Sequence, residues 1–409
     1  MNKQLRSYLI LSISILLGIG TGFSNQQVLI KTAEVISTLF LNFLSMIAAP
    51  IVLLSILSTL INMRGLEQMK SLGKRIISYT LITTTLASLV ALAFFLILDP
   101  VSVAQKGSES ATEIQQQPYL HFIEEIIPSN IFKAFAENKV ISIAFLGFLF
   151  GITPHFLPEE HRNTLQKGFS ALFQLFLKIA GIVPRLMPFA IWAFMTLLVQ
   201  ELQNQSGDTS SLWIYLISIV SANLAQGVIV IPLLLKLRGV SPWRIAKGGF
   251  KALLMAFFTK SSNATLPITL NVAKEELGIR PEVANFTLPL CTVINMNGCA
   301  AFILTTVLFV AGINGHVFSP LDLTFWVFLS VLAAFGNAGV PMGCFFLSSA
   351  FLISMNVPLT TMGLILPFYA LIDMEETALN VWSDLSVAAI VDRESIKAEN
   401  FEKPLVSEL

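Results

Sequence analysis

Three carboxylates are aligned within one apolar stretch near the C-terminus, between residues 371 and 393. Positions three, four, seven and eleven residues after Asp373 share its face on a helix of 3.6 residues per turn. These positions hold Glu376, Thr377, Asn380 and Asp384. In a membrane-spanning helix such carboxylates could bind cations, protons or a substrate amine. Glu375 falls off this face, and we do not expect it to take part.

The composition places this helix in a membrane. The chain has 409 residues, of which 55% are hydrophobic and 12% charged. Soluble domains carry roughly 25% charged residues, so an integral membrane protein is predicted. The net charge is zero, which gives no indication of a nucleic-acid partner. Neither the cysteines nor the histidines have metal-ligand spacing, and we expect free, buried thiols at Cys291, Cys299 and Cys344.

Apolar runs of bilayer length recur through the first 240 residues, at 7–23, 36–62, 76–98, 140–157, 169–200 and 211–236. Pro184 and Pro188 predict a bend in the fifth run, and the polar segment 99–135 predicts a loop outside the membrane. Lysines and arginines alternate between the connections so that both termini are predicted to be cytoplasmic, with an even number of spans. The expected fold class is an all-α multi-pass membrane protein.

After Leu237 the apolar segments are interrupted by small polar residues, at 260–267, 295–298 and 336–343. Broken helices at membrane depth must be buried in protein or line a cavity. Interrupted segments in corresponding positions of two halves indicate a transporter's binding site. We therefore expect two inverted units of hairpin plus helix, at about 242–312 and 322–392. The alternatives are a turn outside the membrane, close-packing glycines, and amides that only join helices.

Charge balance supports a functional reading of the acidic face. Lys260 is the one basic residue expected at the depth of the three carboxylates, and it cannot neutralise them all. Bound cations, protons or a substrate amine must supply the remaining charge. Asp373 and Asp384 are about 16 Å apart along a helix, too far to share a water, so no catalytic residues are predicted. A channel is a further alternative, but it needs neither paired gates nor an amine-binding carboxylate.

Four segments in this order resemble the dicarboxylate/amino acid:cation symporter family, the glutamate transporter homologues. They read SSNATLPITLNVAKEELGI, NFTLPLCTVINMNGCA, GNAGVP and NVWSDLSVAAIV. The resemblance implies a homotrimer in the bacterial plasma membrane. Each protomer would have eight transmembrane helices, two re-entrant helical hairpins, inverted repeats and an elevator-type movement. It implies no catalytic activity.

The resemblance also divides the chain. It implies a scaffold that includes the first two spans, 1–75, and a third span, 76–98, in a transport domain. Residues 99–237 would hold the loop and spans four to six, mostly scaffold, with span six in the transport domain. Residues 238–393 would form the transport core with both hairpins and spans seven and eight, followed by a cytoplasmic tail at 394–409.

The family's site positions fall on polar residues of this chain. Substrate-binding positions fall on Ser261, Ser262, Asn263, Val340, Pro341, Asp373, Glu376, Thr377 and Asn380. Coupled sodium ions are implied at Thr83, Thr84, Asn295, Met296, Asn297, Asn380 and Asp384. Within these sets, the resemblance implies that Asp373 binds the substrate amine and Asn380 its α-carboxylate.

This chain departs from the family pattern at several positions. Asn297 replaces an aspartate, Cys299 a threonine and Tyr369 an acidic residue. Members that carry acidic substrates have an arginine where this chain has Glu376, and arginine suits a substrate carboxylate. We therefore predict a neutral or cationic amino acid as substrate, with sodium as coupling ion because Asp384, Asn295 and Asn380 persist. The alternative is proton-coupled symport of glutamate, aspartate or a dicarboxylate, with a protonated Glu376.

Overall fold

The computed structural model describes residues 3–61, 70–102, 127–137, 139–204, 210–335, 337, 340 and 342–406. Within these ranges every regular element is a helix, which confirms the predicted all-α class. Pro341, Gly336 and Gly339, three of the residues expected at the second hairpin tip, lie outside the described residues.

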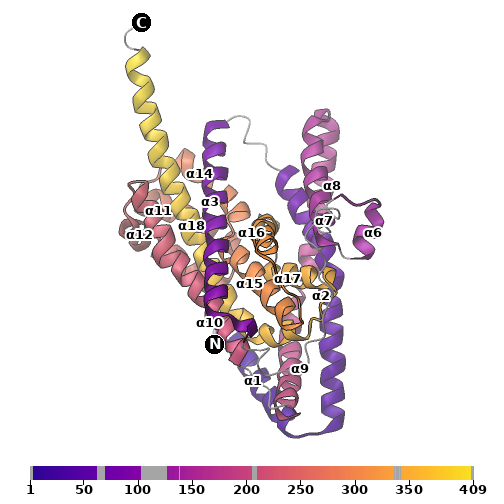
Figure 1. The fold of residues 1–409 in the computed structure, drawn as a ribbon. Helices are drawn as coiled ribbons and strands as arrows, with labels where there is room; N and C mark the ends of the chain where they lie inside the picture. Colours follow the sequence, from indigo (N-terminus) through magenta and orange to yellow (C-terminus); the bar gives the residue numbers. More distant parts are fainter. Residues whose placement is uncertain are drawn as a thin grey trace.

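One group of helices comes mainly from the first half of the chain. In it α2 packs against α7, α8 and α9, while α1 lies along α9 (Figure 1). Gly22 allows this last approach, because a Cβ there would lie 2.5 Å from Val199 Cβ. The members are α1 (Lys3–Phe23), α2 (Gln27–Ile61), α6 (Ile131–Ala136), α7 (Val140–Ile152), the turn η2 (Thr153–Phe156), α8 (Glu159–Ala180) and α9 (Val183–Asn204).

The remaining helices surround α15, whose residues are buried almost throughout. Helices α3, α10, α16, α17 and α18 all pack against it, and α12 and α14 lie along α18. The elements are α3 (Lys70–Leu98), α10 (Ser210–Ala225), η3 (Gln226–Val230), α11 (Ile231–Leu237), α12 (Pro242–Thr259), α13 (Ser262–Asn271), η4 (Val272–Glu276), α14 (Pro281–Ile294), α15 (Asn297–Ile313), α16 (Pro320–Phe335), α17 (Gly343–Ser354) and α18 (Thr360–Val406).

The helices are interrupted at the polar residues that predicted a break. Helix α12 ends at Lys260, which has a left-handed φ of +54°, and α13 turns back against α12. Asn295 and Met296 are not helical and separate α14 from α15. In contrast, α18 is continuous over 47 residues, about 70 Å at 1.5 Å per residue. It extends well beyond the other helices toward the C-terminus (Figure 1).

Three helical stretches among the described residues are long and apolar enough to cross a bilayer, by length and composition. They are Leu72–Ser102, Ser210–Leu237 and Pro281–Ile313, and the bent pair Glu159–Ala180 and Arg185–Gln200 could supply a fourth. The helical architecture with these apolar stretches agrees with a multi-pass membrane protein. The count of eight spans, the re-entrant nature of the hairpins and the two-domain division stay predictions.

The bend predicted for the fifth apolar run is present, but its position differs. The two helices meet at 47°, with the break at Gly181 and Ile182. Pro184 lies in the first turn of α9. A proline is tolerated there because the backbone N–H groups of the first turn have no partner within the helix. Helix α8 begins ten residues before the apolar run at 169–200, because Glu159 and Glu160 in its first turn favour a helix start there.

Candidate functional site

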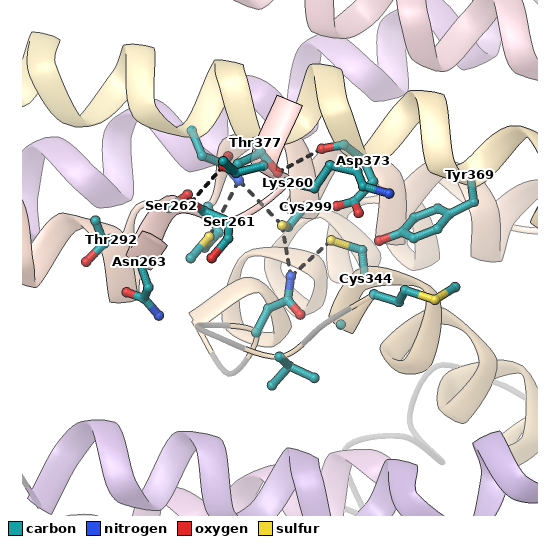
Figure 2. A pocket seen from close by; sticks show the side chains of 17 residues that line it. Lys260, Ser261, Ser262, Asn263, Thr292, Cys299, Cys344, Tyr369, Asp373 and Thr377 are labelled. Atoms are coloured by element: carbon teal, nitrogen blue, oxygen red, sulfur yellow. Dashed lines mark hydrogen bonds between the residues drawn. The ribbon is translucent and has the colours of Figure 1, made fainter. Parts of the chain in front are cut away.

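A cavity of about 230 Å³ lies where the α12–α13 turn and the start of α17 meet the α14–α15 break and α18 (Figure 2). It brings together seven of the predicted substrate residues: Ser261, Ser262, Asn263, Val340, Asp373, Thr377 and Asn380. The other lining residues are Thr259, Lys260, Thr292, Met296, Cys299, Asn337, Met342, Gly343, Cys344 and Tyr369. The volume is below that of a drug-sized pocket, which is roughly 300–1,000 Å³, and suits a small polar substrate.

Opposite charges face this cavity. Asp373 lines it from α18, and Lys260 lines it from the turn between α12 and α13 (Figure 2). Thr377 donates its hydroxyl to the Asp373 carbonyl oxygen (2.7 Å), so the Asp373 carboxylate does not take this hydrogen bond. An ammonium group and a carboxylate in one small cavity can bind the two charged groups of an amino acid.

Helix N-termini add to the anion-binding side of the cavity. The first residues of α13 and α17 line it, at Ser262 and Gly343, and Met296 lines it just ahead of α15. Unpaired backbone N–H groups and the helix dipole make such termini favourable for a carboxylate. Ser261 caps α13, since its Oγ accepts from Ala264 N (3.2 Å), so its hydroxyl also orients the tip.

A second polar cluster lies on the same face of α18, around Asp384. Asn295 Nδ2 donates to Asp384 Oδ1 (2.9 Å), and Asn295 Oδ1 accepts from Thr83 Oγ1 (2.9 Å). Ser383 Oγ donates to the same Asn295 oxygen (3.3 Å). The non-helical backbone at Asn295 lets one amide bridge α3 and α18. The structure thus brings three predicted sodium-site residues, Thr83, Asn295 and Asp384, into one network.

Several buried polar atoms of the predicted sodium set have no hydrogen-bond partner among the described residues. They are Asp384 Oδ2, Thr84 Oγ1 and both amide atoms of Asn297. Leaving a buried polar atom unpaired costs about 1–3 kcal/mol. Carboxylate, hydroxyl and amide oxygens are the ligands of hard cations, so the three oxygens among these atoms could bind one, whereas Asn297 Nδ2 could not.

Asn380 and Met296 lie between the cavity and the Asp384 network. Asn380 Oδ1 accepts from the backbone N of Gly298 (2.9 Å), and its Nδ2 approaches Met296 Sδ (3.5 Å). Both side chains also line the cavity. The residue next to Met296, Asn295, binds Asp384, so the α14–α15 break connects the two polar regions directly.

Glu376 does not line the cavity, in contrast to the other predicted substrate residues on α18. It is 1% exposed and packs behind Gly298, where a Cβ would lie 2.7 Å from Glu376 Cα. Glu375 points away from this region, as expected, and lies half-buried beside Asn223 of α10.

The sequence did not reveal two cysteines of the cavity lining. Cys299 and Cys344 are free and buried, as predicted, but their thiols also meet near the Glu376 carboxylate. Asn337 Nδ2 donates to both sulfurs, over 2.9 and 3.0 Å. The two cysteines are 45 positions apart, and the only sequence signal is that each adjoins a polar interruption.

Comparison with known proteins gives consistent results. The family model described as sodium:dicarboxylate symporter family matches residues 8–394. The L-cystine uptake protein TcyP of Bacillus subtilis is 26% identical over 407 residues, covering 92% of this chain and 87% of TcyP. An uncharacterized symporter of Haemophilus influenzae is 28% identical, with coverage of 88% and 86%. The TcyP of Shouchella clausii is also 28% identical, with coverage of 85% and 78%. From this match over nearly its whole length, the chain belongs to the sodium:dicarboxylate symporter family.

Proposed function

We propose that the chain is a secondary active symporter that couples inward sodium movement to uptake of a neutral or cationic amino acid. The observation that carries the proposal is the cavity itself. It presents Asp373 and Lys260 to a substrate, and the α14–α15 break joins it to the Asp384 network. Cation-coupled amino-acid transport needs charged groups that bind the substrate and, close to them, ligands that bind the cation.

Cystine is the substrate that we propose to test first. Of the three relatives described above, two are named for L-cystine uptake and the third is a symporter. Cystine carries an ammonium and a carboxylate at each end and has no net charge. One end would place its ammonium at Asp373 and its carboxylate near Lys260 and the N-terminus of α13. Serine and lysine are the neutral and cationic amino acids for comparison.

Coupling would arise from the residues shared by the two regions. A sodium ion near Asp384 would neutralise that carboxylate and fix Asn295, whose neighbour Met296 lines the cavity. Substrate contact with Asn380 would in turn stabilise the hydrogen bond from Gly298 N. Each ligand then favours the geometry that the other needs, which is a reciprocal coupling between sites.

The second candidate is proton-coupled symport of glutamate, aspartate or a dicarboxylate. Its support is that Glu376 is 1% exposed and that no N–H or O–H donor among the described residues reaches its carboxylate oxygens. A buried unpaired carboxylate is costly, so a proton on Glu376 would relieve the cost and supply the coupling ion. In that case Lys260 would bind the side chain of an acidic substrate.

Uptake by the purified protein in proteoliposomes separates these candidates. Labelled cystine, serine, lysine, glutamate and aspartate would each be offered under an inward sodium gradient and, separately, an inward proton gradient. We expect sodium-driven accumulation of a neutral or cationic amino acid. Selective accumulation of glutamate or aspartate would refute that assignment. Proton-driven uptake lost in Glu376→Gln would establish the second candidate.

We also propose that the protein acts as a homotrimer in the bacterial plasma membrane, with both termini cytoplasmic. The support is the family membership together with the alternation of basic residues between the connections. The mass of the detergent-solubilised complex, corrected for bound detergent, would test the trimer. A monomer or dimer that retains full uptake would contradict it.

A further inference from the structure

Three potential metal ligands from three different helices converge beside the cavity. Cys299 Sγ belongs to α15, Cys344 Sγ to α17 and a Glu376 carboxylate oxygen to α18, and all three atoms lie within 4.8 Å of one another. The residues are 5%, 2% and 1% exposed. They are far apart in sequence, so only the packing of α17 and α18 on α15 brings them together.

The donor set suits zinc rather than a hard cation. Zinc binds cysteine sulfur at about 2.3 Å and carboxylate oxygen at about 2.0–2.2 Å, in tetrahedral geometry. Tetrahedral ligands at those distances are about 3.5–3.8 Å apart. The present atoms need to approach by at most about 1.0–1.3 Å, within reach of small side-chain rotations. Thiolate ligands disfavour magnesium and calcium, which prefer oxygen.

Two features of this cluster suit it to accept a cation. Both Glu376 oxygens are buried without an N–H or O–H donor among the described residues, and the polar groups beside this carboxylate are the thiols of Cys344 and Cys299. Asn337 Nδ2 donates to both sulfurs, at 2.9 and 3.0 Å, as an outer partner of metal-bound cysteines does. Gly343 leaves room for this amide, because a Cβ there would lie 1.5 Å from Asn337 Oδ1.

We infer that Cys299, Cys344 and Glu376 form a binding site for a zinc-class divalent cation, separate from the Asp384 network. Binding forms two metal–sulfur bonds and one metal–oxygen bond, and it releases the two thiol protons to solvent. Both cysteines line the cavity, so a water or a substrate group there could supply the fourth ligand.

A bound zinc ion would tie the start of α17 to α15 and α18. Because Gly343 and Cys344 at the start of α17 line the cavity, fixing this helix would inhibit transport. This consequence rests on the proposed transport function, whereas metal binding itself does not.

Cadmium titration of the full-length detergent-purified protein tests the site without any substrate. Cadmium–thiolate bonds give an ultraviolet charge-transfer band, so we expect a band that saturates at one cadmium per chain and is displaced by zinc. The band should be lost in Cys299→Ser and in Cys344→Ser but kept in Cys291→Ser, whose thiol is buried outside the cluster. Asn337→Ala should weaken binding by about 10- to 100-fold.

A wild-type protein without the band, or a band unchanged in both cluster variants, would overturn the inference. Folding of each variant is checked by its thermal unfolding midpoint, and zinc should raise that midpoint in the wild type and in Cys291→Ser but not in Cys299→Ser or Cys344→Ser. Uptake is measured separately with and without zinc. Inhibition that disappears in Cys344→Ser supports the fixing of α17 by zinc, and zinc binding without inhibition refutes it.

Discussion

Gly298→Ala perturbs the point where the broken helix contacts the acidic helix. A Cβ at position 298 would lie 2.7 Å from Glu376 Cα and 2.8 Å from Glu376 Cβ. Because the first of these is a backbone atom, side-chain rotation cannot accommodate the methyl group, and α15 must move away from α18. Overpacking of this kind costs about 1–3 kcal/mol. The displacement also weakens the hydrogen bond from Gly298 N to Asn380 Oδ1, worth about 1 kcal/mol.

The expected loss in the free energy of unfolding is therefore about 2–4 kcal/mol, or about 30-fold or more in the folded-to-unfolded ratio. The assay is thermal unfolding of the purified variant in detergent, followed by uptake in proteoliposomes. Gly168→Ala on α8 is the matched control, since no atom lies within 4 Å of its added Cβ. A Gly298→Ala protein that unfolds and transports like Gly168→Ala would refute the close packing of α15 on α18.

Three further predictions concern other parts of the molecule. Asp384→Asn keeps an acceptor for Asn295 but removes the charge, so cation-driven accumulation should be abolished while the protein still folds. Arg280→Ala breaks the pair between Arg280 Nε and Asp392 Oδ1 (2.8 Å) and should lower the free energy of unfolding by about 1.5–3 kcal/mol. Burial lowers the pKa of His316, in the loop after α15, below its ordinary value of 6.5, so the folded state favours the neutral imidazole. The unfolding free energy should then be highest above about pH 6.5 and fall by up to about 1.4 kcal/mol per unit as the pH drops toward the folded pKa, a slope that His316→Gln removes.

Each of these predictions has a matched control. The control for Asp384→Asn is Glu282→Gln, which changes an exposed acid on α14 and should leave accumulation intact. If Asp384→Asn still showed sodium-driven uptake, Asp384 would not belong to the cation site. Lys251→Ala breaks an exposed pair with Glu276 (3.3 Å) and should have little effect on unfolding. Equal losses in the free energy of unfolding for Arg280→Ala and Lys251→Ala would contradict the prediction that the Arg280–Asp392 pair contributes more. For the histidine, exposed His161→Gln should keep the wild-type pH slope.

The interruptions of the helices could be predicted from the sequence because their cause is local. Polar residues at 295–298 inside an apolar run indicate backbone that is not helical, and the break falls at Asn295 and Met296. The periodicity of α18 likewise placed Asp373, Thr377 and Asn380 on the face that lines the cavity. Both inferences need only helical geometry and the cost of unpaired backbone in a membrane.

Contacts between helices could not be predicted in this way. Periodicity put Glu376 on the same face as Asp373, but the close approach of α15 at Gly298 encloses Glu376 behind the cavity. The meeting of Cys299 with Cys344 depends on how α17 packs against α15. The link between Thr83 and Asn295 spans 212 positions, and only the family resemblance suggested that they belong together.

Substrate-stimulated influx of radioactive sodium into proteoliposomes tests the central claim most directly. The vesicles hold purified protein, and unlabelled cystine, serine, lysine or glutamate is added outside. We predict that a neutral or cationic amino acid stimulates sodium influx, that glutamate does not, and that Asp384→Asn abolishes the stimulation. Influx stimulated by glutamate alone, or amino-acid accumulation with no accompanying sodium influx, would contradict the account.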